Sequence, residues 1–188
     1  SLSDYLGVIR SSGDEARRLY EDLMITVTEF FRDADVYQEL QKTVLPKVFQ
    51  GKTSSDSVRI WSAGCATGEE PYSLAILALE HLAKMDSAPQ LSIFATDTHS
   101  AALQMARDGF FPETIAEHVS EERLEQFFFR VDDRYRIKKA VRDCIIFAPH
   151  SVLRDPPFSR LDLVLCRNLL IYLKREVQER VLELMHYA

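Results

Sequence analysis

Apolar positions along the chain fall into short continuous runs that alternate with longer segments of helical spacing. The short runs read as strands, at 58–63, 91–97, 144–148 and 161–166. Segments between them, such as 71–85 and 100–108, repeat apolar residues at the period of a helix face. This alternation predicts an α/β fold with a parallel sheet and right-handed crossovers.

Helical spacing also dominates the chain before the first strand. Residues 1–24 read as amphipathic helix with a break at 11–13. Thr26 and Glu29 have the spacing of a capping box, which predicts that a new helix starts near Thr26. In that helix Thr28 and Arg32 are four residues apart and share one face, and the alternative is a packed helix with a solvated arginine. A further helix is expected over 35–49.

Residues 111–143 interrupt the alternation of strands and helices. They predict a small insertion with a short helix at 120–127 and a hairpin of strands 127–131 and 135–139. The last helix begins at Arg175. We therefore divide the chain into an N-terminal helical segment, 1–24, and an α/β domain, 25–188, that carries the insertion.

Composition narrows the class of protein. The chain of 188 residues is 46% hydrophobic and has a formal net charge of −6, which disfavours a generic nucleic-acid-binding protein. Its three cysteines lack metal-binding spacing and read as free thiols in a reducing cytoplasm, and its five histidines are scattered. No secretion signal is visible, and no apolar run approaches the ~18 residues of a membrane span, so we expect no membrane insertion. The spacing of the cysteines and histidines leads us to expect no metal site.

A glycine turn between the first strand and its helix carries the most specific chemistry. Gly64 and Gly68 bound the turn, and Glu69 and Glu70 follow at the helix start. A helix N-terminus attracts anions, yet carboxylates already occupy this one and would repel a pyrophosphate. The pattern favours a ligand with positive charge, such as S-adenosylmethionine, over NAD. The alternative is a structural turn with acidic capping.

Polar residues also follow two later strands. Asp97 ends the second strand, where an acid can bind ribose hydroxyls, and the alternative is an N-cap for the next helix. Arg167, Asn168 and Tyr172 follow the fourth strand and would face the cleft at the carboxyl ends of the strands. The alternative is a surface cation and an aromatic at the edge of the core.

One motif is misleading. The segment from Asp155 to Phe158 reads Asp-Pro-Pro-Phe, a signature of methyltransferases that act on amino groups of DNA bases. In those enzymes the motif follows the fourth strand, whereas here it precedes that strand. We expect the two prolines to stiffen a loop.

Four of these segments together resemble the CheR family of chemotaxis receptor methyltransferases. The matching segments read Thr-Glu-Phe-Phe-Arg at 28–32, Trp-Ser-Ala through Glu-Glu-Pro-Tyr-Ser at 61–73, Ala-Thr-Asp at 95–97 and Cys-Arg-Asn-Leu-Leu-Ile-Tyr at 166–172. The resemblance covers about residues 24–188. It implies a Rossmann-like class I methyltransferase sheet and methyl transfer from S-adenosylmethionine to glutamate carboxylates on receptor helices, with S-adenosylhomocysteine as product.

The same resemblance implies the residues of the site. The implied cofactor-binding residues are Thr26, Thr28, Arg32, Gly64, Glu70, Asp97, Ser151, Val152, Cys166, Arg167 and Asn168. Arg32, Arg167 and Tyr172 are implied near the transferred methyl group as catalytic residues. A glutamate substrate is ionised at neutral pH, so no general base is required.

Departures from the family pattern shape the expected partners. The family continues with further C-terminal strands, so we expect this chain to be part of a larger signalling protein with other modules. The hairpin around Asp132 lacks the longer loop of members that tether to a receptor tail peptide, so no such tethering is expected. A non-catalytic S-adenosylmethionine-binding module of a sensory protein remains the alternative. A nicotinamide-dependent oxidoreductase and a nucleic-acid methyltransferase are weaker ones.

Overall fold

The structure is a computed structural model that describes residues 2–23 and 27–188. Its centre is a four-stranded sheet whose strands are all parallel, in the order β6-β2-β1-β7. The strands are β1 (Ser57–Ala63), β2 (Gln90–Asp97), β6 (Ile145–Pro149) and β7 (Leu163–Leu165). The predicted α/β fold with a parallel Rossmann-like sheet is confirmed, and each strand lies within two residues of its predicted bounds.

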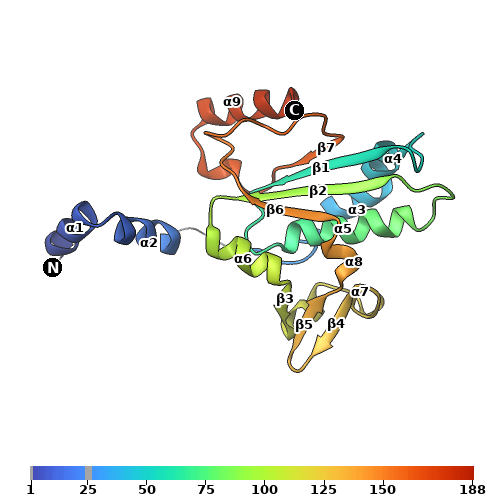
Figure 1. Cartoon of the computed structure of the whole chain (residues 1–188), viewed down its shortest axis with the longest axis horizontal. Helices are drawn as coiled ribbons and strands as arrows, with labels where there is room; N and C mark the ends of the chain where they lie inside the picture. Colours follow the sequence, from blue (N-terminus) through green and yellow to red (C-terminus); the bar gives the residue numbers. More distant parts are fainter. Residues whose placement is uncertain (1, 24–26) are drawn as a thin grey trace.

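Helices cover the sheet on both sides, and its central strands β1 and β2 bury apolar residues that include Val58, Ile60, Ile93 and Ala95. Figure 1 shows α5 (Glu69–Leu82) and α6 (Ser100–Asp108) below the sheet and α9 (Arg175–His186) above it. Helix α5 is buried without interruption from Pro71 to Ala78. On strands β1 and β2, Trp61 and Phe94 pair in register, and both contact the ring of Phe158. The Asp-Pro-Pro-Phe segment thus lies in a loop that packs against the sheet.

The predicted helix over 35–49 is confirmed as a continuous helical stretch. It consists of α3 (Ala34–Glu39), a π-helical turn η1 (Leu40–Val44) and α4 (Leu45–Phe49). Pro46 stands in the first turn of α4, where it has no N–H to donate to the preceding turn. The π turn accommodates this missing hydrogen bond.

The predicted helix start near Thr26 is wrong. Thr26 lies outside the described residues, but 27–33 are not helical and the helix begins at Ala34. Phe31 and Asp33 have positive φ angles of 52° and 59°, which end any helical path. Tertiary contacts hold this conformation, because the Phe31 N–H donates to Ser73 Oγ at 3.0 Å. Thr28 and Arg32 therefore do not share a helix face.

The insertion is a compact unit beside α5 and α6. It contains β3 (Phe110–Pro112), η2 (Glu113–Glu117), α7 (Glu121–Phe127), β4 (Phe128–Val131), β5 (Arg134–Ile137) and α8 (Lys139–Arg142). The predicted helix and hairpin are present, and β3, which was not predicted, completes an antiparallel sheet in the order β3-β5-β4. The Phe30 ring packs edge-on against Phe111 and Phe128, with centroids 4.8 and 5.5 Å apart.

The N-terminal segment forms α1 (Leu2–Ser11) and α2 (Gly13–Leu23), as predicted, with the break at Ser12. Figure 1 shows both helices extending away from the sheet. Tyr5 donates to the Glu15 carboxylate at 3.0 Å between the two helices. Among the helices of the described chain, none has the length and apolar character that crossing a bilayer requires.

Candidate functional site

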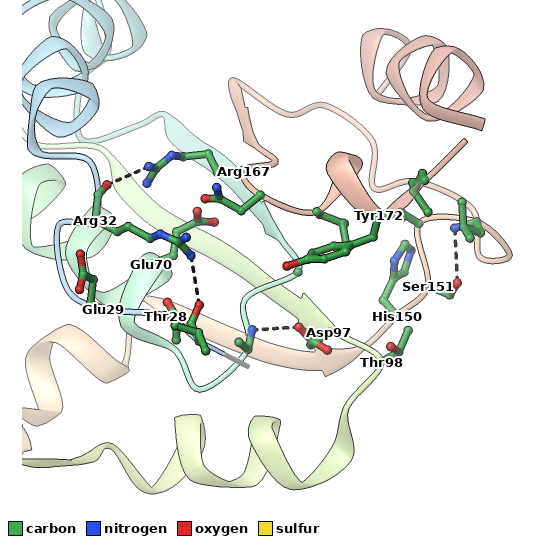
Figure 2. Close-up of a pocket in the computed structure, with 18 of the residues that line it drawn as sticks. Thr28, Glu29, Arg32, Glu70, Asp97, Thr98, His150, Ser151, Arg167 and Tyr172 are labelled. Atoms are coloured by element: carbon green, nitrogen blue, oxygen red, sulfur yellow. Dashed lines mark hydrogen bonds between the residues drawn. The ribbon is translucent and has the colours of Figure 1, made fainter. Parts of the chain in front are cut away.

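A cavity of about 420 Å³ opens at the carboxyl ends of the parallel strands, where open α/β sheets bind ligands. Figure 2 shows its polar side chains converging from the loop before α3, the first turn of α5 and the segments after β2, β6 and β7. Its volume lies within the range of small-molecule sites. The lining residues are Val27, Thr28, Glu29, Arg32, Tyr37, Gly64, Ala66, Glu70, Asp97, Thr98, His150, Ser151, Val152, Leu153, Arg167, Asn168, Leu169, Tyr172 and Leu173.

The glycine turn contributes backbone at the cavity wall. Gly64 has a φ of 77° and donates its N–H to Thr96 O at 2.8 Å, and it lines the cavity. Gly68, with a φ of 100°, has a different purpose: a Cβ there would lie 2.9 Å from the Ala106 Cβ. The two glycines of the turn therefore have different roles. Gly64 lines the ligand cavity, and Gly68 allows close packing against α6.

Glu70 is the buried carboxylate of the cavity. Burial raises its pKa to about 7, against the opposing effects of a hydrogen bond from Ser62 Oγ at 2.8 Å and the nearby charge of Arg167. Glu69 does not share the site, because its carboxylate accepts a hydrogen bond from Thr67 Oγ1 at 2.6 Å within the turn. Of the two acids at the start of α5, only Glu70 thus lines the cavity, and its carboxylate favours a cationic ligand group.

Asp97 ties the end of β2 to the glycine turn. Its Oδ2 accepts the Ala66 N–H and its Oδ1 accepts the His99 N–H, both at 2.9 Å. Asp97 is not the N-cap of α6, since His99 holds that place and its Nδ1 accepts the Ala102 N–H at 3.0 Å. Each carboxylate oxygen has a further lone pair, and Asp97 lines the cavity. The residue can accept ribose hydroxyls while it holds the turn.

The guanidinium groups of Arg32 and Arg167 lie on the side of the cavity away from Asp97. Arg167 is largely buried and donates to Arg32 O at 2.8 Å and Asp33 Oδ2 at 2.5 Å. Its guanidinium also stacks on the Tyr37 ring, 5.2 Å from the centroid. Arg32 donates to Val27 O at 3.1 Å. Both cations reach a cavity wall that also holds Glu70, as Figure 2 shows.

The segment after β6 forms the wall near the ends of β2 and β6. The Ser151 N–H donates to Asp155 Oδ2 at 2.7 Å, so the acid of the Asp-Pro-Pro-Phe segment closes a turn. Val152 and Leu153 supply apolar surface to the cavity. His150 also lines it, with its ring stacked on Phe158 and its Nε2 3.0 Å from Pro156 O. This wall suits a flat aromatic base more than a charged group.

Ten of the twelve predicted site residues line this cavity, one described residue does not, and one lies outside the described residues. Cys166 is not a lining residue; it is half-buried, and burial and the charge of Glu70 raise the pKa of its thiol to about 11. Thr26 lies outside the described residues. Tyr172 lines the cavity with 59% of its surface exposed, at the mouth.

Several lining residues were not expected from the sequence. They are Val27, Glu29, Tyr37, Ala66, Thr98, His150, Leu153, Leu169 and Leu173. Most of them are next to a predicted site residue in the sequence, so their place near the motifs could have indicated that they line the cavity. Tyr37 has no such signal, because it lies on α3, after the positive-φ residue Asp33, whose conformation was not predicted.

The cavity fits a cofactor that carries both an adenosyl group and an ammonium group. A buried carboxylate with one hydroxyl donor has room for a cation, Asp97 has free lone pairs for hydroxyls, and the wall after β6 is partly apolar. Among the described residues, no group of three histidine, cysteine or acidic side chains is arranged to hold a metal ion.

Comparisons with known proteins agree with this geometry. Residues 26–188 match the family described as "CheR methyltransferase, SAM binding domain". The chain is 45% identical over its full length to an uncharacterized 104.1 kDa protein of Rhodobacter capsulatus, of which it covers 20%. It is 33% identical to a putative methyltransferase, Cher3, of Pseudomonas putida, over 90% of this chain and 62% of that protein.

A third relative is named a chemotaxis protein methyltransferase, from Listeria monocytogenes. It is 35% identical over 82% of this chain and 56% of its own length. The chain thus spans between 20% and 62% of the length of these three relatives. The chain belongs to the CheR methyltransferase family, and residues 26–188 correspond to its S-adenosylmethionine-binding domain.

Proposed function

We propose that this domain transfers a methyl group from S-adenosylmethionine to glutamate side-chain carboxylates on receptor helices of the chemotaxis type, in the cytoplasm. The observation that carries the proposal is Glu70. A carboxylate buried at a helix start, beside the ligand cavity, would repel a phosphate group and attract an ammonium group. Membership of the CheR family supports the same cofactor.

Different residues of the cavity would bind different parts of the cofactor. Glu70 would receive its ammonium group, and the raised pKa of that carboxyl would fall when the positive charge arrives. Asp97 would accept the ribose hydroxyls, and the wall after β6 would hold the base. When bound, S-adenosylmethionine supplies an electrophilic methyl group on its sulfonium. The chain's own task is to fix the site and exclude water around it.

The substrate carboxylate is a nucleophile that needs no general base, because glutamate is ionised at neutral pH. Arg32 is the cation available to attract it: its side chain lines the cavity and donates to one carbonyl, Val27 O. Arg167 is more constrained, since Asp33, Arg32 O and the Tyr37 ring already hold it. We therefore assign substrate attraction to Arg32, the wall of the site to Arg167, and the rim of the mouth to Tyr172.

Other partners follow from the insertion and the relatives. The β4–β5 hairpin has four-residue strands with a tight turn at Asp132 and Asp133, which supports the proposal that no receptor tail peptide is tethered there. The larger size of the Rhodobacter relative supports further modules in the whole protein. Calorimetry with a receptor tail peptide tests the first point, and measurable binding would contradict it.

The test of the activity is a labelled-methyl assay with the whole protein and receptor membranes. Carboxyl methyl esters release methanol in base, whereas methylated amines do not. Base-labile label on the receptor, lost when receptor glutamates are replaced by alanine, is the expected result. Base-stable label would exclude carboxyl methylation. Cofactor binding without any transfer would favour the alternative, a non-catalytic S-adenosylmethionine-binding module.

A further inference from the structure

We infer that Arg123, in the insertion, is a positioning residue for Arg32 of the cofactor cavity. Arg123 contacts Phe31, the neighbour of Arg32, and is not itself a cavity-lining residue. Its contact with Phe31 gives Arg123 a route to the cavity through the loop 27–33, in addition to its ion pair with Glu80 of α5. The inference rests on the proposed use of this cavity for S-adenosylmethionine.

The Arg123 side chain is rigidly held. Its Nε and Nη2 donate to the two carboxylate oxygens of Glu80 in α5, at 2.7 and 2.9 Å. Gln41 donates to the same carboxylate at 3.2 Å, and the two charged side chains are only 23% and 18% exposed. A bidentate pair of this kind fixes the plane of the guanidinium as well as its position.

That fixed guanidinium covers the ring of Phe31, with its central carbon 4.5 Å from the ring centroid. Phe31 is a strained residue, since bulky side chains rarely adopt a φ of 52°. Its N–H is held by Ser73 Oγ and its ring also packs edge-on against Tyr37 at 5.4 Å. The Arg123 stack thus completes a set of contacts that keep Phe31 in an unfavourable conformation.

Arg32 depends on this conformation more than on contacts of its own. In the described part of the chain, its side chain makes a single hydrogen bond, to Val27 O in the same loop. The direction in which its guanidinium enters the cavity is therefore set by the backbone at Phe31. A loop freed from Arg123 would move Arg32 and leave α5, Glu70 and Asp97 in place.

A double-mutant cycle tests this coupling with S-adenosylhomocysteine as the probe in titration calorimetry. The four proteins are the wild type, Arg123→Met, Arg32→Met and the double variant. Arg123→Met removes the partly buried cation–π contact with Phe31. We expect this loss to weaken the binding of S-adenosylhomocysteine about fivefold. In the Arg32→Met background the same change should cost less than about twofold, because the affected residue is already gone. Independent, multiplicative losses would overturn the inference.

Two further variants separate positioning from general stability. Arg130→Met is the matched control, since Arg130 lies in the same insertion but its guanidinium lies 6.0 Å from the Tyr135 ring, within the insertion, and not over Phe31. It should leave the affinity for S-adenosylhomocysteine unchanged. Glu80→Gln keeps an acceptor for Arg123 and should weaken binding less than Arg123→Met does. Equal losses in all three variants would show a merely structural role.

Hydrogen exchange provides a readout that needs no ligand. The Phe31 amide, bonded to Ser73, should exchange at least about tenfold faster in Arg123→Met and at the wild-type rate in Arg130→Met. Unchanged exchange in Arg123→Met would overturn the inference. If the wild type failed to bind S-adenosylhomocysteine, the proposed use of the cavity would fail, and the exchange experiment would still decide the coupling.

Discussion

Arg167 and Asp33 form an ion pair at 2.5 Å although 134 residues separate them in sequence. The pair joins the segment after β7 to the loop before α3, and both segments contribute residues to the cavity wall. Arg167 adds a second hydrogen bond, to Arg32 O, and a stack on Tyr37. The stack on Tyr37 needs a planar cation, which lysine lacks.

Arg167→Lys should therefore weaken both the cavity and the fold. Loss of the stack on Tyr37 and of the two hydrogen bonds from Arg167 Nη2 predicts destabilisation by about 1–3 kcal/mol, measured by urea denaturation. Affinity for S-adenosylhomocysteine should fall by about fivefold or more. Arg175→Lys is the control, because Arg175 is exposed on α9 and its contact with Glu179 is within one helix. A variant of wild-type affinity and stability would remove Arg167 from this role.

The buried carboxyl of Glu70 should make stability depend on pH. Its pKa in the folded protein is about 7, above the unfolded value of about 4.3, so the folded state binds the extra proton. The ligand-free protein should therefore lose stability as pH rises from about 4.3 to 7, by up to about 4 kcal/mol. Glu70→Gln should remove this loss, so that the variant is more stable than the wild type at pH 8 and not at pH 4.5.

Urea denaturation at the two pH values checks this expectation. Glu117→Gln, an exposed glutamate of the insertion, is the matched control and should follow the wild type at both. The same Glu70→Gln change should weaken binding of S-adenosylhomocysteine at pH 8, because the ammonium group loses its partner. A variant that gains affinity there would contradict the assignment of Glu70.

Asp97→Ala should weaken the binding of S-adenosylhomocysteine by about 1–3 kcal/mol through lost hydrogen bonds. It should also lower stability, since the carboxylate accepts the Ala66 and His99 amides. Asp97→Asn keeps one acceptor and should retain more of the stability than Asp97→Ala. Calorimetry and thermal unfolding measure the two effects. Unchanged affinity in both variants would exclude Asp97 from ribose binding.

Gly68→Ala should destabilise the domain by about 2–4 kcal/mol. The new Cβ would lie 2.9 Å from the Ala106 Cβ, at a backbone φ of 100° that side chains rarely adopt. Gly13→Ala is the control, because nothing lies within 4 Å of a Cβ there and the residue starts a helix. That change should be neutral or slightly stabilising. A tolerated Gly68→Ala would contradict the close packing of the turn against α6.

Periodicity alone predicted the sheet and the helices between its strands. The helix 100–108 agrees with α6 at both ends, because His99 and Gly109 supply its cap and its stop within the sequence itself. The strand-turn-helix unit at Gly64 and the acid at the end of β2 were found for the same reason. Their signals are short apolar runs with a turn residue at a known offset, and such signals are local.

Contacts with residues far away in the sequence determine the conformation of the loop before α3. A capping box at Thr26 and Glu29 favoured a helix, but Ser73 and Arg123 bind Phe31 in a conformation that no helix allows. The same loop brings Tyr37 into the cavity. Local propensity is worth a few tenths of a kcal/mol per residue, so a few tertiary contacts override it.

By itself, then, the sequence determined that this protein is an α/β domain with a ligand site at the carboxyl ends of its strands and an acid at the first helix. Tertiary structure alone decided that Glu70 rather than Glu69 faces the cavity, that Gly68 serves packing, and that Arg123 supports the loop of Arg32. The reason is physical. The period of apolar residues is a local property of the sequence. The direction of a side chain depends on neighbours that are far away in the sequence and that folding brings into contact.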